Sequence, residues 1–168
     1  MKALPGPMSI AINAKEAPSG LQTDGKGKKL HQVAAFPLRR GKAGYEACLV
    51  TTRETRRWTI PKGWPIKGCP DCDAAATEAR QEGGLVGKVR KRPFGSYLYW
   101  KRLPAEFRLI EVAVYRLDVK RQLATWKESA ERYVMWFPLA IATELVSEPG
   151  LKSLFTAMAR KCGASSEG

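Results

Sequence analysis

A rigid loop followed by a short helix constrains the fold of this sequence more than any other segment. Prolines and glycines interrupt residues 61–70 and exclude a helix there. Residues 74–82 are mostly good helix formers, and Asp71 or Asp73 is predicted to cap the helix and to complement its dipole. The pair Gly83-Gly84 predicts the end of the helix.

Strands are predicted on both sides of this loop and helix. Short runs rich in β-branched and aromatic residues, bounded by Gly and Pro, indicate strands at residues 32–39, 45–52, 58–60, 85–91, 95–101, 107–119 and 133–137. Two further helices are predicted at residues 139–145 and 151–161. The second has one apolar face that we expect to pack in the core, made by Leu151, Leu154, Phe155 and Met158.

The length of 168 residues suits one domain that can bury a core without disulfides or a metal. We expect a flexible basic tail at residues 1–29, a domain at residues 30–162 and a short tail at residues 163–168. No segment approaches the ~20 apolar residues of a membrane span, and the first residues lack the apolar stretch of a signal peptide. A cytoplasmic location is therefore expected.

The chain is strongly basic. Its 29 Lys and Arg against 16 Asp and Glu give a net charge of +13. Such a charge favours a negatively charged partner, and nucleic acid, anionic lipid and a polyphosphate metabolite all fit it. Composition alone does not choose among these partners. It also fits a basic surface that is simply solvated and binds no partner.

Three polar side chains share one face of the helix predicted after the loop. Glu78 and Glu82 are one turn apart, and Gln81 follows Glu78 by three residues. Carboxylate and amide oxygens beside a glycine-rich loop are the hard ligands that Mg²⁺ prefers, with phosphates and water completing its shell. Spacing alone also leaves open a solvated polar face that binds nothing.

This segment resembles the Nudix box, the signature G-x5-E-x7-R-E-U-x-E-E-x-G-U of the Nudix hydrolases, in which U is apolar. Five of the nine specified positions match, namely Gly63, Glu78, Glu82, Gly84 and Leu85, and Ala79 makes a sixth match if Ala counts as apolar. Residues 57–63 resemble the strand before the box, and residues 32–35 resemble the family's first core strand. The form of the loop looks like a bacterial branch related to diphosphoinositol and dinucleoside polyphosphate hydrolases. The resemblance implies an α/β fold, a Nudix-type α/β/α sandwich with a mixed β-sheet.

Three positions depart from the family's box. Cys69 and Thr77 stand where the family has a Glu and an Arg that often pair, and losing both partners leaves no unpaired buried charge. Gln81 stands on a metal-ligand position, where its amide oxygen can still bind but one negative charge is lost. We therefore expect the site to bind divalent metal more weakly, to hold fewer metal ions or to react more slowly. The alternative is an active site that has lost its activity.

The resemblance implies hydrolysis of a phosphoanhydride bond in a dinucleoside polyphosphate, a diphosphoinositol phosphate or another nucleoside diphosphate derivative. Glu78 and Glu82 would be catalytic and would hold Mg²⁺, or Mn²⁺, with Gln81 and the carbonyl near Gly63 assisting. The general base would be Glu78 or a later acid, and the sequence does not rank Glu106, Glu111, Glu128 and Glu131. A Nudix-fold module that binds nucleotide or RNA without cleaving it is the alternative.

Four basic residues are candidates for binding the phosphates of this substrate. Arg39 and Arg53 occupy positions like those that contact phosphate in the inositol polyphosphate branch. Lys62 and Lys67 lie in the loop itself, where ammonium groups suit phosphate as point charges. Each of the four taken singly fits an ordinary surface charge equally well.

Two further patterns are less specific. Basic residues at 88–92 precede aromatic residues at 97–102, a pattern that fits nucleic acid or a plain strand face. No RNA-binding signature accompanies it, so nucleic acid is the second choice of partner. Cys69 and Cys72 form a C-x-x-C without a second pair, and His31 is remote in sequence, so zinc is not favoured. A monomer and a homodimer both fit the sequence.

Overall fold

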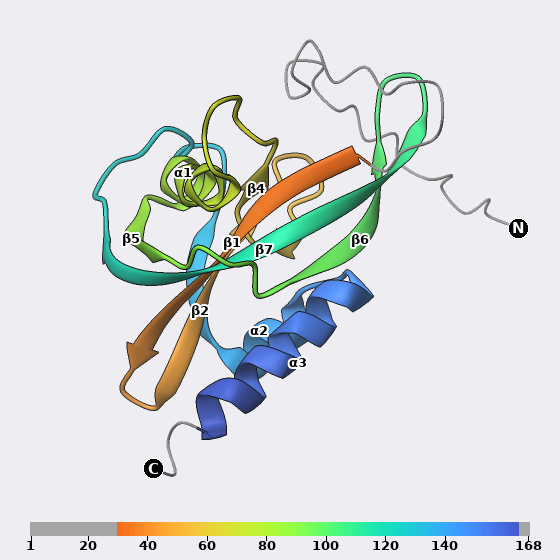
Figure 1. The fold of residues 1–168 in the computed structure, drawn as a ribbon. Coiled ribbons are helices and arrows are strands. Elements are labelled where there is room, and N and C mark those ends of the chain that lie inside the picture. Colours follow the sequence, from red (N-terminus) through yellow and green to blue (C-terminus); the bar gives the residue numbers. More distant parts are fainter. Residues whose placement is uncertain (1–29, 165–168) are drawn as a thin grey trace, which may run out of the picture.

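A computed structural model describes residues 30–164, which form one mixed sheet with helices on both faces (Figure 1). The strands are β1 (Leu30–Gly41), β2 (Gly44–Thr51), β3 (Trp58–Thr59), β4 (Lys62–Gly63), β5 (Leu85–Val89), β6 (Gly95–Arg102), β7 (Phe107–Gln122) and β8 (Val134–Pro138). The helices are α1 (Asp71–Gly83), α2 (Leu139–Leu145) and α3 (Pro149–Ala164). The predicted tail at residues 1–29 lies outside the described residues, whereas α3 extends into the predicted C-terminal tail.

The sheet has the order β3-β2-β1-β7-β5, with β4 pairing with β1, β6 with β7 and β8 with β2. β1 and β7 run parallel in its centre, and the other pairs are antiparallel. This combination makes the sheet mixed, as the resemblance to the Nudix family implies. No helix in residues 30–164 is long and apolar enough to cross a membrane.

Each face of the sheet has its own core, because α1 covers one face and α2 with α3 covers the other (Figure 1). On the α1 side, the small residues Ala75 and Ala79 let the helix lie close to the sheet. On the α3 side, the predicted apolar face is confirmed. Leu151, Phe155 and Met158 are fully buried there, and Leu154 is partly buried.

The ends of α1 differ in how well the sequence predicts them. The N-cap is Pro70, without a side-chain cap, so the prediction that Asp71 or Asp73 caps the helix is wrong. Both carboxylates lie in the first turn, where they complement the helix dipole but come too late to cap it. The C-terminal prediction holds, since Gly84 has φ 66° and its N–H bonds to helix carbonyls.

Two residues of the predicted loop form a strand. Lys62 and Gly63 make up β4 and pair with Ala34 and Val33 of β1. A strand of two residues has no hydrophobic period, so the sequence does not reveal it. The pairing fixes the loop against the sheet and brings Gly63 beside α1.

Candidate active site

The close approach of β4 to α1 places Gly63 against the side chain of Glu78. A Cβ atom on residue 63 would lie 2.3 Å from Oε1 of Glu78, so only glycine fits without moving that carboxylate. Two box positions that lie fifteen residues apart in the sequence therefore meet in space. The structure brings together this part of the predicted site.

Arg132 is the centre of a buried ionic network at the end of α1. Its Nη2 atom lies 3.2 Å from Oε1 of Glu82 and 3.5 Å from Oε1 of Glu128. Its Nη1 atom donates a hydrogen bond to the backbone oxygen of Thr51 (3.0 Å). We define Glu78, Glu82, Glu128 and Arg132 as the box cluster. Because Arg132 lies opposite Glu82 and Glu128, the fold supplies part of the positive charge that these buried carboxylates need.

The segment between β7 and β8 holds this network against α1. The indole N–H of Trp126 donates to the backbone oxygen of Glu82 (3.1 Å), and the backbone N–H of Glu128 donates to the backbone oxygen of Gln81 (3.0 Å). Both carbonyls belong to the last turn of the helix, which leaves its own carbonyls unpaired. The segment thereby positions Glu128 beside the two helix carboxylates.

Burial sets the protonation behaviour of the acidic groups. It raises the pKa of Glu82, with the charges of Arg132 and Lys62 acting in the opposite direction. Burial also raises the pKa of Glu78, and the neighbouring Glu128 raises it further. Both shifts mean that the ionised carboxylates would gain from additional positive charge.

The donor set of the box cluster fits a hard divalent cation in its chemistry. It holds three carboxylates that would be stabilised by positive charge, next to the Gly63 backbone and Gln81. Within residues 30–164, no three His, Cys, Asp or Glu side chains are grouped so that they could hold a metal ion. The guanidinium of Arg132 instead contacts Glu82 and Glu128. Metal binding at these residues therefore requires the Arg132 contacts to rearrange.

The four predicted phosphate-binding residues are placed differently. Arg53 lies at the box cluster, 3.6 Å from Glu128 and 3.3 Å from Glu131. Lys62 lies close enough to Glu82 for that charge to raise its pKa, although burial lowers the pKa more strongly. Lys67 is exposed in the turn before α1.

The structure does not bring Arg39 to the box cluster. Arg39 is six residues beyond Val33, the residue of β1 that pairs with Gly63. Six residues of strand span roughly 20 Å. The Arg39 side chain pairs with Glu46 (3.1 Å) and covers the ring of Trp136 (4.0 Å).

The structure also ranks the later acids. Glu128 belongs to the box cluster, and the carboxylate of Glu131 pairs with Arg53, which also contacts Glu128. Glu106 pairs with Arg108 beside the turn between β6 and β7. Sequence reasoning missed Arg132 and Trp126. The only available signal was the i, i+4 spacing of Glu128 and Arg132, which is too common to be diagnostic.

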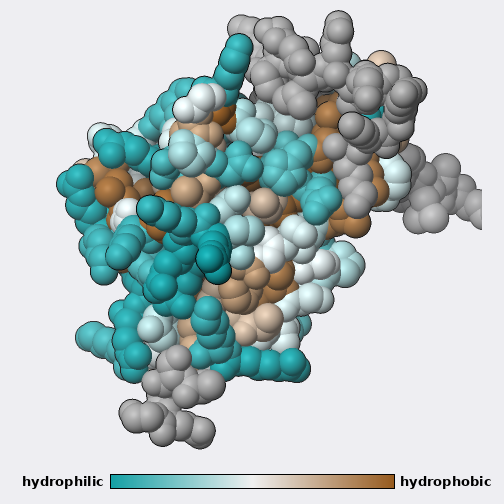
Figure 2. All heavy atoms as spheres, viewed as in Figure 1, coloured by the Kyte–Doolittle hydropathy of each residue, from teal (hydrophilic) through white to brown (hydrophobic). Residues whose placement is uncertain are grey.

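The remaining sequence patterns have structural explanations. Cys72 is buried in the α1 core, Cys69 is partly buried, and neither forms a disulfide. His31 lies 3.6 Å from Asp71 at the start of α1. The basic segment at residues 88–92 is mostly exposed. The face of the molecule in Figure 2 carries broad hydrophilic areas with hydrophobic patches among them.

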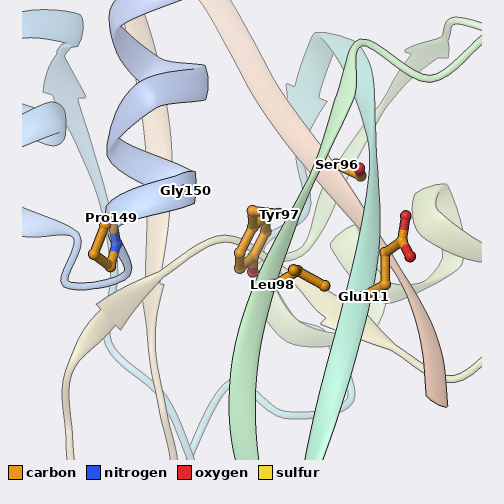
Figure 3. A pocket seen from close by; sticks show the side chains of 6 residues that line it. All are labelled: Ser96, Tyr97, Leu98, Glu111, Pro149 and Gly150. Carbon is orange, nitrogen blue, oxygen red and sulfur yellow. The ribbon is translucent and has the colours of Figure 1, made fainter. Parts of the chain in front are cut away.

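An open hollow of about 470 Å³ lies at the free edge of β6 (Figure 3). Tyr97 points from β6 toward the start of α3, where Pro149 and Gly150 lie, and Glu111 lies on the opposite side. None of the residues that line this hollow belongs to the box cluster.

The fold matches solved structures of Nudix proteins. An Ap4A hydrolase from C. elegans is 14% identical over 80% of this chain and 98% of its own, with a TM-score of 0.61. A Nudix hydrolase from Nitrosomonas europaea is 15% identical over 80% and 91%, also with a TM-score of 0.61. The Nudix domain of Shewanella oneidensis NrtR, crystallised with ADP ribose, is 15% identical over 79% and 88%, with a TM-score of 0.54.

No protein-family model and no curated protein matches the chain. The structural likeness and the spacing of Gly63, Glu78 and Glu82 agree with each other. The chain therefore has the Nudix fold.

Proposed function

We propose that the chain is a metal-dependent hydrolase of a phosphoanhydride bond in an anionic polyphosphate metabolite. Residues 30–162 would form its catalytic unit. The observation that carries the proposal is the convergence of Glu78, Glu82 and Glu128, from two distant segments, at one end of α1. The Nudix fold and the net charge of +13 support it.

Glu78 and Glu82 would hold Mg²⁺ or Mn²⁺, assisted by the Gln81 amide and the carbonyl near Gly63. When bound there, such an ion would neutralise phosphate oxygens and lower the pKa of the attacking water. Glu128 is our candidate for the general base, because its side chain is 12% exposed and lies beside the helix carboxylates.

Cationic side chains around the box cluster would bind the phosphates. Arg53 lies at its exposed side, and Lys62 and Lys67 lie in the adjoining loop. A guanidinium can bridge two phosphate oxygens, and an ammonium acts as a point charge. We leave Arg39 out of this set because of its distance along β1.

A second candidate function rests on Arg132 and Gln81. Arg132 already neutralises part of the charge of Glu82 and Glu128, and Gln81 is neutral. Such a site could bind a polyphosphate or a nucleotide without cleaving it. This module would bind its ligand equally well with and without Mg²⁺.

The test is chromatographic detection of the phosphorylated products from dinucleoside polyphosphates, ADP-ribose, nucleoside triphosphates and diphosphoinositol phosphates, with and without Mg²⁺ or Mn²⁺. We expect metal-dependent turnover that falls about a hundredfold in Glu82→Gln. Glu144→Gln, at an exposed position on α2, is the matched control and should keep wild-type turnover. If no substrate of the panel is cleaved and one of them binds tightly without metal, the result would support the binding module instead.

A further inference from the structure

The strand β6 lies at the border of the sheet. It pairs with β7 on one side, and no other strand within residues 30–164 pairs with it (Figure 1). Its outer edge therefore leaves backbone N–H and C=O groups without a strand partner along an element of eight residues. Such an edge is a template for pairing with another extended segment.

The side chains of β6 alternate between the core and the surface. Tyr97 and Tyr99 pack in the core on the α3 side of the sheet, whereas Leu98 and Trp100 point to the other face. Leu98 is 45% exposed and Trp100 is 66% exposed, and the exposed ring of Phe107 on β7 extends the same surface. The solvated face of an antiparallel strand usually carries polar side chains, so large apolar residues there indicate a partner.

The neighbouring strand β5 shows how this chain protects an edge. β5 also pairs with β7, but its register shifts between Val86 and Gly87, and it carries the charged Lys88. Bulges and lysines are devices that keep an edge from pairing with other molecules. β6 pairs with β7 in continuous register from Gly95 to Arg102, and its charges lie only at the end of the strand. The centre of β6 lacks both forms of protection.

The sequence of β6 is complementary to itself when two copies run antiparallel. In a continuous antiparallel sheet, directly opposed side chains lie on the same face. With a two-fold axis at Tyr99, Leu98 of each copy faces Trp100 of the other, and Ser96 faces Arg102. This register removes both exposed apolar side chains of each strand from water, and opposed aromatic and aliphatic side chains stabilise a sheet.

Charge and shape also fit this register. Arg102 of one copy would lie on the same face as Glu111 of the other, two strand spacings of about 4.8 Å away and one row along, which two long side chains can span. The Arg102 residues of the two copies would lie roughly 20 Å apart, at opposite ends of the paired strands. The hollow of about 470 Å³ beside Ser96, Leu98 and Glu111 leaves space at this edge for the incoming Trp100 (Figure 3).

We propose that β6 pairs antiparallel with β6 of a second copy of this chain, so that two sheets join across a two-fold axis near Tyr99. The proposal does not depend on the proposed function. Each copy carries a net charge of +13, which opposes association, and one strand pair buries less surface than a standard interface. We therefore expect a dissociation constant of about 10 µM, and added salt should strengthen the dimer by screening the repulsion.

The test is sedimentation velocity of the full chain between about 1 and 100 µM. Trp100→Lys should weaken the dimer at least about tenfold, because it replaces the central aromatic contact with a charge. The matched control is Met135→Lys, at an exposed apolar position of β8, which should leave the dissociation constant unchanged. Both positions are exposed, so both variants should unfold near the wild-type melting temperature.

Two further measurements test the register and the occupant of the edge. Ser96→Glu places a carboxylate opposite Arg102 and should tighten the dimer about threefold, whereas Ser96→Lys should weaken it by a similar factor. Hydrogen exchange of the amides in residues 96–102 should slow as the protein concentration rises.

Several results would overturn the proposal. They are a chain that stays monomeric over the whole concentration range, a dimer that Met135→Lys weakens as much as Trp100→Lys, and a dimer that Ser96→Glu weakens. A dimer that dissociates in added salt would indicate bridging by a bound polyanion instead of strand pairing. Slow exchange of the β6 amides in a monomer would mean that another segment of the chain covers this edge.

Discussion

The box cluster and the unsatisfied cluster contain similar groups but differ in how the fold treats them. In the box cluster, Arg132 donates to Thr51 and contacts two of the three carboxylates. In the unsatisfied cluster, formed by Thr59, Trp64, Tyr97 and Glu148, an indole N–H, two neighbouring hydroxyls and a carboxylate oxygen are buried without a well-formed hydrogen bond in the described residues. The box cluster is thus stabilised largely by contacts within residues 30–164, whereas four polar atoms of the unsatisfied cluster have no hydrogen-bond partner there.

The comparison separates polar groups that the fold itself must compensate from polar groups that can stay unpaired until a ligand binds. A buried charge must be compensated before the protein can fold, so a guanidinium opposite Glu82 serves the fold first. A neutral hydroxyl such as that of Tyr97 costs less to leave unpaired, so the fold can tolerate it until a ligand binds. Each cluster has an exception, since Nε of Arg132 and one carboxylate oxygen of Glu148 are buried atoms of charged side chains without a partner in residues 30–164.

Removing Arg132 should have the largest effect on stability. Arg132→Met leaves Glu82 and Glu128 buried without their guanidinium, so the free energy of unfolding should fall by about 3–5 kcal/mol. Urea denaturation measures this loss, and adding Glu82→Gln to the same chain should recover part of it. Tyr97→Phe should change stability by less than about 1 kcal/mol. A larger loss for Tyr97→Phe than for Arg132→Met would reverse the comparison.

Gly63→Ala should affect the site more than the fold. The new Cβ would meet the Glu78 carboxylate, which is the movable end of a flexible side chain. We expect Mn²⁺ affinity and turnover to fall about tenfold, with less than about 1 kcal/mol lost from the free energy of unfolding.

Gly87→Ala is the structural control for this variant. Its Cβ would lie 2.0 Å from the backbone oxygen of Asp118, which cannot rotate away. We expect a loss of about 2 kcal/mol or more in denaturation and no specific loss of metal affinity. Tight Mn²⁺ binding by Gly63→Ala would show that the Glu78 carboxylate does not contribute to the metal site.

Gln81→Glu restores the carboxylate that the family's box has at this position. The added negative charge should strengthen Mn²⁺ binding several-fold in calorimetric titration. It should also lower stability by about 0.2–0.5 kcal/mol in EDTA, because the new carboxylate lies three residues from Glu78 on the same helix face. Unchanged metal affinity would mean that residue 81 does not face the bound ion.

The smallest expected effect is a pH dependence of phosphate binding. Burial, together with the charge of Lys62, lowers the pKa of Lys101 to about 8. The amine is therefore charged below pH 8 and loses its charge as the pH rises, so pyrophosphate affinity should fall about threefold between pH 7 and pH 9. Lys101→Arg keeps its charge and should flatten the profile. A wild-type affinity that rises over this range would contradict the role of Lys101.

Local chemistry explains what the sequence predicts correctly. The helix over the box, its end at Gly84 and the apolar face led by Leu151 and Phe155 follow from spacing and backbone preference within a few turns. The mixed sheet follows from the resemblance to the Nudix box, because no short-range signal specifies the parallel pairing of β1 with β7.

The parts that the sequence misses depend on contacts between distant segments. Arg132 reaches Glu82 from fifty residues away in the chain, and no pattern around either residue signals the pairing. The two-residue strand β4 exists only because β1 lies beside it. The unsatisfied cluster draws on three segments, and each of its residues alone has the composition of an ordinary core or turn.

The most direct test of the contrast between the box cluster and the unsatisfied cluster is steady-state kinetics with a nucleoside polyphosphate. The measurement compares the wild type with Glu82→Gln and Glu148→Ala. We predict that Glu82→Gln lowers kcat about a hundredfold with little change in KM. Glu148→Ala should instead raise KM about tenfold, by more than it lowers kcat. A Glu82→Gln variant with wild-type kcat, or a Glu148→Ala variant whose whole loss lies in kcat, would contradict the assignment of chemistry to the box cluster and recognition to the unsatisfied cluster.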